Sequence, residues 1–351
     1  MKGIYKVGFF TLMVGGTAMA IHATTWFNAW VGLELNMMTF LPFMIRGGEP
    51  LGAEAGLKYF LVQAVASLVM LASVMMGEFI EGTEELNQIF SGTKSGGSIM
   101  VWGVGLALAL KLGMAPLHFW FPSIVENLTW GNLMILLTWQ KIAPMKLLAD
   151  VEWGVEGGGL LNGLILSSIF VGSVGGILQT SLAKVMAYSS MTHMGWMAGG
   201  VKLGGESWLL YLMTYSLMSL ALIWVFQREG CFKLPHLWMK NSISPLVKLS
   251  LLIGVLSMGG LPPFLGFFPK WWIVTGLMEI GEKALGMVMV LTTLITLYYY
   301  FRVAFVVFMH LNSNPGLEGA HPVKENWNWV WGGGLMGLNF GGLMVGSLMM
   351  T

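Results

Sequence analysis

About eleven stretches of this 351-residue sequence are long and apolar enough to cross a lipid bilayer as α-helices. A hydrocarbon core roughly 30 Å thick requires about 20 apolar helical residues, and every backbone polar group must be paired inside it. We therefore predict an all-α polytopic membrane protein. The expected spans are residues 4–21, 25–45, 57–77, 99–120, 127–148, 159–178, 183–201, 207–227, 245–279, 284–310 and 327–350.

The composition agrees with this fold class and excludes several functions. Hydrophobic residues make up 56% of the chain and charged residues 10%, and the formal net charge is +1. Such a balance gives no reason to expect a nucleic-acid partner. The single cysteine, Cys231, excludes a disulfide framework and a multi-cysteine metal or iron–sulfur site. Because the chain also has no P-loop and no strand-borne GxGxxG, we expect it to bind no nucleotide, redox cofactor or metal.

The N-terminal residues 1–20 carry two lysines before an apolar run, as signal peptides do, but the run is long and more spans follow. We interpret this segment as a first span that stays. Methionine (29 residues) outnumbers isoleucine, and tryptophan (16 residues) is frequent. An organellar genetic code that reads one isoleucine codon as methionine and one stop codon as tryptophan produces this bias, which indicates a mitochondrially encoded protein.

Charges between the spans predict the orientation of the bundle. If the N-terminus lies on the positive side, most lysines and arginines fall on that side and most acidic residues on the other. We therefore expect the N-terminus on the matrix or cytoplasmic side of the membrane and the C-terminus on the opposite side. Two short spans within 245–279 would reverse the pattern after the acidic turn at 279–283, so we favour one discontinuous helix there.

Four charged residues lie far from any loop: Glu34, Lys111, Lys141 and Lys270. Placing such a charge at the centre of a membrane helix costs at least about 2.5–3.5 kcal/mol, so these side chains should face the bundle interior and meet water or a partner. Arg302 lies off-centre in its span. For Arg302 the alternative of a side chain that extends to a lipid headgroup stays open.

Prolines accompany the three lysines. A proline has no N–H to donate and leaves a backbone carbonyl without its helical partner. In a bilayer such a carbonyl must be met by protein or water, so we predict helix breaks with hydrated polar sites. The expected break positions are Pro116, Pro144, Pro262, Pro263 and Pro269.

Buried lysine, carboxylate and imidazole groups can pass protons along a line of trapped water, because burial and neighbouring charges adjust their proton affinities. His118 and His193 are candidates to join such a line. Each has a structural alternative: His118 could lie at the membrane interface, and His193 could be hydrogen-bonded to a neighbouring helix.

The two broken spans are the fourth and the ninth, so they cross the membrane in opposite directions, which is typical of an inverted-topology repeat. We expect a single transmembrane domain built from two five-helix repeats and a last helix. Its expected parts are 1–156 with the broken helix 99–120, 157–310 with the broken helix 245–279, and 311–351, all within 1–351.

Six segments together resemble a known family. They are WVGLELNMMTFLPFM, EAGLKYFLVQAVAS, LKLGMAPLHFWFPSIVENLTW, LLTWQKIAPM, LAKVMAYSSMTHMGWM and GGLPPFLGFFPKW. The chain resembles mitochondrial NADH dehydrogenase subunit 2, an antiporter-like membrane subunit of respiratory complex I, from about residue 25 to 305. The loop 81–97 and Arg302 match nothing that we can assign.

The resemblance implies a role for each matching residue. Glu34 corresponds to a glutamate that pairs with a broken-helix lysine, and Lys111 corresponds to that lysine. Lys141 corresponds to a central lysine, His118 to a bridging group, and Lys270 to the lysine on the exit side. The flavin mononucleotide, iron–sulfur clusters and ubiquinone would belong to other subunits. Expected partners are other complex I membrane subunits, including neighbouring antiporter-like ones, and lipids such as cardiolipin.

The sequence therefore predicts a proton-translocating subunit of complex I in the mitochondrial inner membrane. Two rival functions remain. A stand-alone cation/proton antiporter would exchange ions without NADH, and a structural spacer of the membrane arm would tolerate neutral substitutions at all four buried charges.

Overall fold

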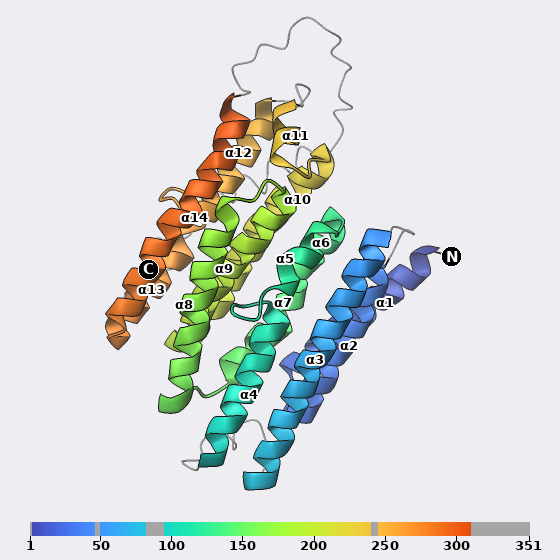
Figure 1. Cartoon of the computed structure of the whole chain (residues 1–351), viewed down its shortest axis with the longest axis vertical. Coiled ribbons are helices and arrows are strands. Elements are labelled where there is room, and N and C mark those ends of the chain that lie inside the picture. The colour runs from blue at the N-terminus through green and yellow to red at the C-terminus, as the bar shows by residue number, and fades with distance from the viewer. Residues whose placement is uncertain (1, 46–49, 82–94, 240–244, 310–351) are drawn as a thin grey trace, which may run out of the picture. The chain divides into compact units, whose positions relative to one another are not determined.

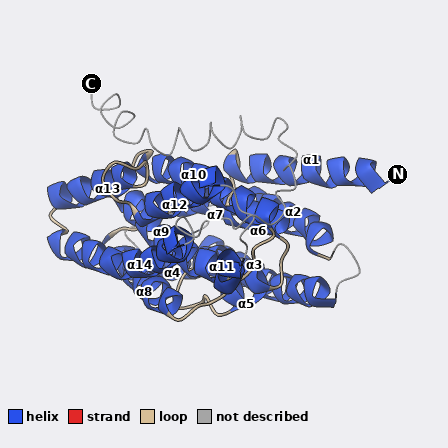
Figure 2. Cartoon of the chain, turned by 90° about the horizontal axis from the view of Figure 1, so that it is seen from above, coloured by secondary structure: helices blue, strands red, loops and turns tan. Residues whose placement is uncertain are grey.

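The computed structural model describes residues 2–45, 50–81, 95–239 and 245–309, which fold almost entirely into helices (Figure 1). The part of the chain so described contains no strand (Figure 2). Ser181 and Lys233 form an isolated antiparallel bridge. The predicted all-α fold is therefore confirmed. The expected last span, 327–350, and most of the 81–97 loop lie outside the described residues.

Two compact units make up the chain, Met1–Ser168 and Ile169–Thr351. Their boundary falls inside the helix α8 (Val155–Ile177), twelve residues beyond the repeat boundary expected at residue 156. α8 is continuous across this boundary, and no loop, proline or charge cluster in the sequence marks the position.

The first unit contains the helices that carry Glu34, Lys111 and Lys141. They are α1 (Lys2–Ile21), α2 (Trp26–Met44), α3 (Pro50–Glu81), α4 (Ser95–Leu112), α5 (Trp120–Glu126), α6 (Trp130–Leu137) and α7 (Trp139–Asp150). α1, α2 and α3 lie side by side (Figure 1), and α3 also packs against both α4 and α5. A Cβ added at Gly32 would lie 2.6 Å from the backbone nitrogen of Ala20, so glycine allows the backbones of α1 and α2 to approach closely.

The second unit contains the helices that carry His193, Lys270 and Arg302. After the end of α8 come α9 (Leu182–Leu203), α10 (Ser207–Glu229), α11 (Leu234–Met239), α12 (Pro245–Gly259), α13 (Phe267–Ile280) and α14 (Lys283–Met309). α12 and α13 follow one another along α14 (Figure 1), and both also contact α10. Residues 245–279 therefore form one discontinuous span, as predicted.

The fourth span is discontinuous as predicted, but it is longer than expected. Residues 113–119 separate α4 from α5, and α5 ends at Glu126 rather than near residue 120. Pro116 lies in this break, and Pro262 and Pro263 lie in the break between α12 and α13.

The other two prolines lie within helices, which corrects the expected break positions. Pro144 lies inside α7, and the chain is interrupted instead at Thr138, where α6 ends and α7 begins. The Thr138 hydroxyl donates to the carbonyl oxygen of Met134 at 2.7 Å, and such back-bonding competes with regular helix geometry. Pro269 lies in the first turn of α13, where the missing N–H has no helical acceptor to lose.

Four helical segments of the described chain are long and apolar enough to cross a membrane by themselves: Pro50–Gly77, Gly157–Ile177, Ser207–Glu229 and Lys283–Met309. The shorter apolar helices include Met100–Leu112 and Val247–Gly259, the first halves of the two broken spans. Their shortness follows from the breaks, because each broken helix covers only part of the hydrocarbon thickness.

Candidate functional site

The first break begins where Gly113 closes α4. The N–H of Gly113 donates to the carbonyl of Leu110 at 3.1 Å, and the N–H of Met114 donates to that of Ala109 at 2.9 Å. Gly113 has φ +72, the left-handed conformation in which glycine terminates helices. Lys111 therefore lies in the last turn of α4, where the negative end of the helix dipole favours a cation.

Side chains from two other helices bind carbonyl groups that the break leaves without helical partners. The Gln63 Nε2 group on α3 donates to the carbonyl oxygen of Lys111 at 3.2 Å. The Ser167 hydroxyl on α8 donates to the carbonyl oxygen of Ala115 at 2.7 Å. Polar side chains thus replace helical hydrogen bonds inside the membrane, as an interrupted span requires.

Lys111 and Glu34 form an ion pair within the first unit. The Lys111 Nζ atom lies 3.7 Å from Glu34 Oε1, and the two side chains are 3% and 19% exposed. This separation is longer than a hydrogen bond but short enough for strong attraction in a poorly hydrated site. The ammonium group therefore meets a carboxylate rather than lipid, in agreement with an inward-facing position.

Lys141 is buried on α7, which packs against α4. Its side chain is 3% exposed, and its Nζ atom lies 5.8 Å from the centroid of the Phe121 ring on α5. An aromatic face attracts a cation. Pro144, three residues after Lys141, has no N–H to donate to the carbonyl group of Gln140, so this stretch of α7 is polar despite its apolar surroundings.

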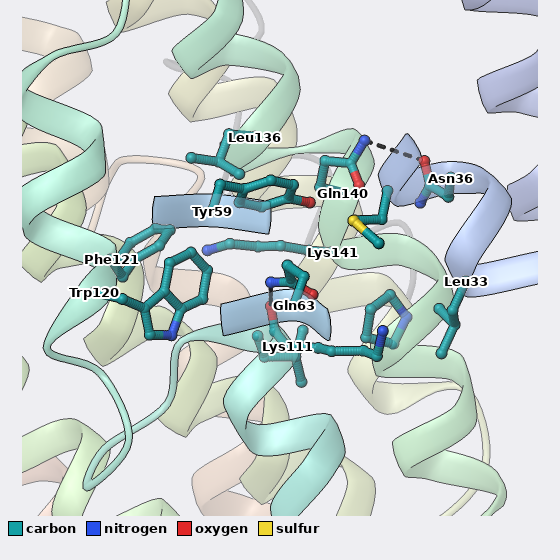
Figure 3. Close-up of a pocket in the computed structure, with 13 residues that line it drawn as sticks. Leu33, Asn36, Tyr59, Gln63, Lys111, Trp120, Phe121, Leu136, Gln140 and Lys141 are labelled. Atoms are coloured by element: carbon teal, nitrogen blue, oxygen red, sulfur yellow. Dashed lines mark hydrogen bonds between the residues drawn. The ribbon is translucent and has the colours of Figure 1, made fainter. Parts of the chain in front are cut away.

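Both lysines line one small cavity (Figure 3). Its volume is about 20 Å³, which exceeds the roughly 10–15 Å³ that one water molecule needs. The lining residues are Leu33, Asn36, Met37, Tyr59, Gln63, Lys111, Leu112, Trp120, Phe121, Leu136, Gln140, Lys141 and Pro144. The structure thus brings together two of the predicted lysines with polar neutral groups between helices α2, α3, α4 and α7.

Carboxamides in this cavity were not predicted from the sequence. The Gln140 Nε2 group donates to Asn36 Oδ1 at 3.1 Å (Figure 3) and approaches Met13 Sδ at 3.4 Å. Asn36 is 2% exposed and Gln63 is 4% exposed. A search of the apolar spans for uncharged amides, and not only for charged residues, would have found all three.

His118 lies in the break but is not one of the residues that line the cavity. Its Nδ1 atom is 3.2 Å from the carbonyl oxygen of Pro116, and its ring packs on Phe119 with centroids 4.4 Å apart. His118 is 8% exposed, so it is largely covered by protein atoms. Its role as a bridging group stays a prediction.

The second break repeats the geometry of the first, but its lysine follows the break in the chain, whereas Lys111 precedes the first break. The N–H of Gly260, which has φ +78, donates to the carbonyl of Ser257 at 2.9 Å. Lys270 follows the break on α13, is 9% exposed, and its ammonium donates to the carbonyl oxygen of Gly259 at 2.9 Å. The lysine therefore caps the interrupted end of α12.

The two breaks also share a sequence pattern that our inspection of the sequence missed. Residues 113–122 and 260–269 both read Gly-x-x-Pro-x-x-x-x-Phe-Pro. In this register α4 and α12 end at corresponding positions, as α5 and α13 begin at corresponding positions. Lys111 then corresponds to Met258 and Lys270 to Ser123, so the two breaks take their ammonium groups from opposite ends.

His193 lies in a buried cluster of hydroxyl groups within the second unit. Its Nδ1 atom is 2.9 Å from the Tyr211 hydroxyl, and its ring lies 4.9 Å from that of Tyr215. Tyr215, Tyr299 and Tyr300 are buried as well, as are Ser189, Ser190 and Thr192 of α9. His193 is 2% exposed and is hydrogen-bonded to the neighbouring helix α10, as the structural alternative for this residue expects. Its role in proton transfer stays a prediction.

Arg302 binds backbone carbonyls instead of extending to a headgroup. Its Nη1 group donates to the carbonyl oxygen of Ile177 at 2.6 Å, and its Nη2 group donates to that of Gln179. Ile177 is the last residue of α8, where carbonyls lack helical donors and attract cations. Arg302 therefore fixes the junction between α8 and α9 to α14.

Among the described residues, no group of three or more histidine, cysteine, aspartate or glutamate side chains could hold a metal ion.

Discontinuous helices with buried lysines at their breaks define an antiporter-like integral membrane protein. The model of the family NADH:quinone oxidoreductase/Mrp antiporter, transmembrane, matches residues 23–296. This range covers both breaks and all the buried charges except Arg302.

Similar proteins narrow the assignment. The NADH-ubiquinone oxidoreductase chain 2 of Anopheles gambiae is 37% identical over 329 residues, which cover 93% of this chain and 92% of the relative. That of Aedes aegypti is 39% identical over 315 residues, covering 90% and 89%. The chain belongs to the NADH-ubiquinone oxidoreductase chain 2 family.

Solved structures agree on the fold. A chain of respiratory complex I from Thermus thermophilus with bound aureothin matches with a TM-score of 0.84 at 23% identity, covering 98% of this chain and 77% of that one. A chain of the Mrp complex from Dietzia sp. DQ12-45-1b matches with a TM-score of 0.75 at 19% identity, covering 84% and 59%. At these identities the likeness concerns the fold alone.

Proposed function

We propose that this chain is a proton-translocating membrane subunit of NADH:ubiquinone oxidoreductase. The single observation that carries the proposal is the ion pair of Glu34 with Lys111 at a helix break, beside a cavity that Lys141 also lines. A buried lysine can gain or lose a proton when the charge beside it changes. Quinone reduction elsewhere in the complex would alter these charges and drive protons along the buried groups.

We propose an order of action for the residues of the first unit. Glu34 stabilises the charged form of Lys111 while the ion pair is closed. When the pair opens, Lys111 loses this attraction and becomes a better proton donor. Lys141 lines the same cavity and is the proposed acceptor in this unit. In the second unit, Lys270 and His193 are the proposed proton carriers, and His118 is proposed as an auxiliary group in the first break.

We also propose the surroundings of the chain. The expected site is the mitochondrial inner membrane, with the N-terminus in the matrix and the C-terminus on the intermembrane side, as the charge distribution indicates. Partners would be the other complex I membrane subunits, including antiporter-like neighbours, and lipids such as cardiolipin. The flavin mononucleotide, iron–sulfur clusters and ubiquinone would be bound by other subunits.

An inverted repeat remains our proposal for the internal organisation. Two observations support it: the shared Gly-x-x-Pro-x-x-x-x-Phe-Pro pattern of the breaks, and the packing of each broken span. α3 contacts both halves of the first broken span, and α10 contacts both halves of the second. α3 and α10 carry the third and eighth expected spans, which correspond in a repeat of five.

Substitution of Lys111 tests the proposed function. We expect Lys111→Met to lower the number of protons pumped per NADH oxidised, because methionine fills the space but carries no proton. The measurement is proton uptake and quinone reduction in vesicles that contain the assembled complex. Lys58→Met is the control, since Lys58 is exposed and pairs with Glu54 on the same helix. An unchanged pumping ratio in a fully assembled Lys111→Met complex would rule the role out.

Two further experiments test the two rival functions. A stand-alone antiporter would exchange cations for protons in vesicles that contain the purified chain without NADH. A structural spacer would keep full pumping when Glu34, Lys111, Lys141 and Lys270 are all replaced by neutral residues.

A further inference from the structure

At each of the two breaks a side chain binds a backbone carbonyl at the interrupted end of the first helix, but the two side chains differ in charge. At the second break the Lys270 ammonium donates to the carbonyl oxygen of Gly259 at 2.9 Å. In a continuous helix this carbonyl would accept from residue 263, which is a proline and has no N–H. At the first break the neutral Gln63 amide donates to the carbonyl oxygen of Lys111 at 3.2 Å, one position before the residue that corresponds to Gly259.

The space beside the glycines that end α12 and α4 is also filled differently. A Cβ added at Gly260 would lie 2.8 Å from Lys270 Nζ, so the ammonium group packs directly against this turn. A Cβ added at Gly113, the corresponding residue, would instead lie 3.1 Å from the Phe121 ring. An aromatic ring therefore takes the position at the first break that an ammonium group takes at the second.

The charge of Lys111 is directed at a carboxylate instead of at the break. Its Nζ atom lies 3.7 Å from Glu34 Oε1 on α2, while the Gln63 amide that binds its carbonyl comes from α3 and is 4% exposed. A neutral amide donates in the same way whether Lys111 is charged or not. The Lys270 ammonium, by contrast, binds the negative end of a helix dipole, and this bond is strong because the donor is charged.

We propose that Gln63 is a positioning residue that caps the interrupted end of α4, so that Lys111 can gain or lose a proton without loosening the first break. At the second break Lys270 itself caps α12, so the loss of its proton weakens the cap. This inference rests on the proposed function and deepens it. A change of charge on Lys111 acts on Glu34, whereas a change of charge on Lys270 acts on the backbone of the second break.

Hydrogen exchange of the assembled complex, followed by mass spectrometry, measures the strength of the first cap. The N–H groups of Gly113 and Met114 donate to carbonyls of α4, and their exchange reports local opening of this helix end. Gln63→Met removes one neutral hydrogen bond and should accelerate this exchange roughly five-fold. Lys111→Met should change it far less. Gln227→Met, the same replacement at an exposed position of α10, is the control.

The second break supplies the matched comparison. Lys270→Met removes a charge-assisted hydrogen bond and should accelerate exchange of the Gly260 amide by at least about tenfold. The two lysine variants lose the same charge, so only their difference in capping separates them. If Gln63→Met does not assemble, this comparison decides alone: equal acceleration by Lys111→Met and Lys270→Met, each at its own break, would overturn the inference.

The pH profile of proton pumping in vesicles is the functional readout. Loss of the cap lets the last turn of α4 move Lys111 relative to Glu34, so Gln63→Met should shift the pH profile. A uniform decrease at every pH would mean a merely structural role and would overturn the inference, as would unchanged exchange at the first break. Normal pumping in Lys111→Met would instead overturn the proposed function, and the exchange results would be unaffected.

Discussion

Replacing Arg302 should loosen the junction between α8 and α9 without disturbing the lysine cavity of the first unit. The guanidinium group donates to the carbonyl oxygens of Ile177 and Gln179. A hydrogen bond from a charged group contributes about 1.5–3 kcal/mol to stability. Because Arg302 is only part-buried, we take the lower end of the range. Arg302→Met should then cost about 3 kcal/mol for the two bonds.

The effect should appear at backbone hydrogen bonds of the same junction. The N–H of Leu182 donates to the carbonyl of Phe232, and the N–H of Leu234 donates to that of Thr180, both at 2.9 Å. Local opening governs the exchange of such amide hydrogens. Since about 1.4 kcal/mol corresponds to a factor of ten, Arg302→Met should accelerate exchange at Leu182 and Leu234 roughly 100-fold.

Hydrogen exchange of the assembled complex, followed by mass spectrometry, measures this change directly. The exchange rates of Arg302→Lys should lie between those of the unsubstituted protein and those of Arg302→Met, because an ammonium group lacks the planar fork that reaches both carbonyls. Arg228→Met is the control, since Arg228 stacks on Trp224 at an exposed position. Equal exchange rates in the unsubstituted, Lys and Met proteins would refute the assignment of Arg302 as the cap of α8.

Two further substitutions test the second unit. A Cβ added at Gly266 would lie 1.9 Å from the carbonyl oxygen of Ser257, so Gly266→Ala should reduce the yield of assembled complex by forcing the backbone apart. Gly131→Ala, where no atom lies within 4 Å of the added Cβ, should assemble normally; similar yields for both would contradict the packing. Tyr211→Phe removes the 2.9 Å contact with His193 and should change the pH profile of pumping if His193 carries protons. A profile identical to that of the unsubstituted complex would argue against this role.

The sequence located the charged groups because their cost in a bilayer is large. Glu34, Lys111, Lys141 and Lys270 were predicted to avoid lipid, and the structure buries the three lysines and pairs Lys111 with Glu34. Neutral polar groups such as Gln63 carry a smaller cost, so hydropathy alone does not single them out. The sequence does not mark the break at Thr138, because threonine is compatible with a helix. Proline is the stronger helix-breaking residue, but Pro144 is accommodated inside α7.

Hydropathy and charge by themselves determined that the chain is a bundle of membrane helices with two interrupted spans, because the bilayer permits few backbone structures. Which side chains meet was decided only by tertiary packing. Glu34 and Lys111 are 77 positions apart along the chain, and Arg302 binds carbonyls more than 120 residues away. Contacts of this kind depend on how the helices cross, which the local sequence does not determine.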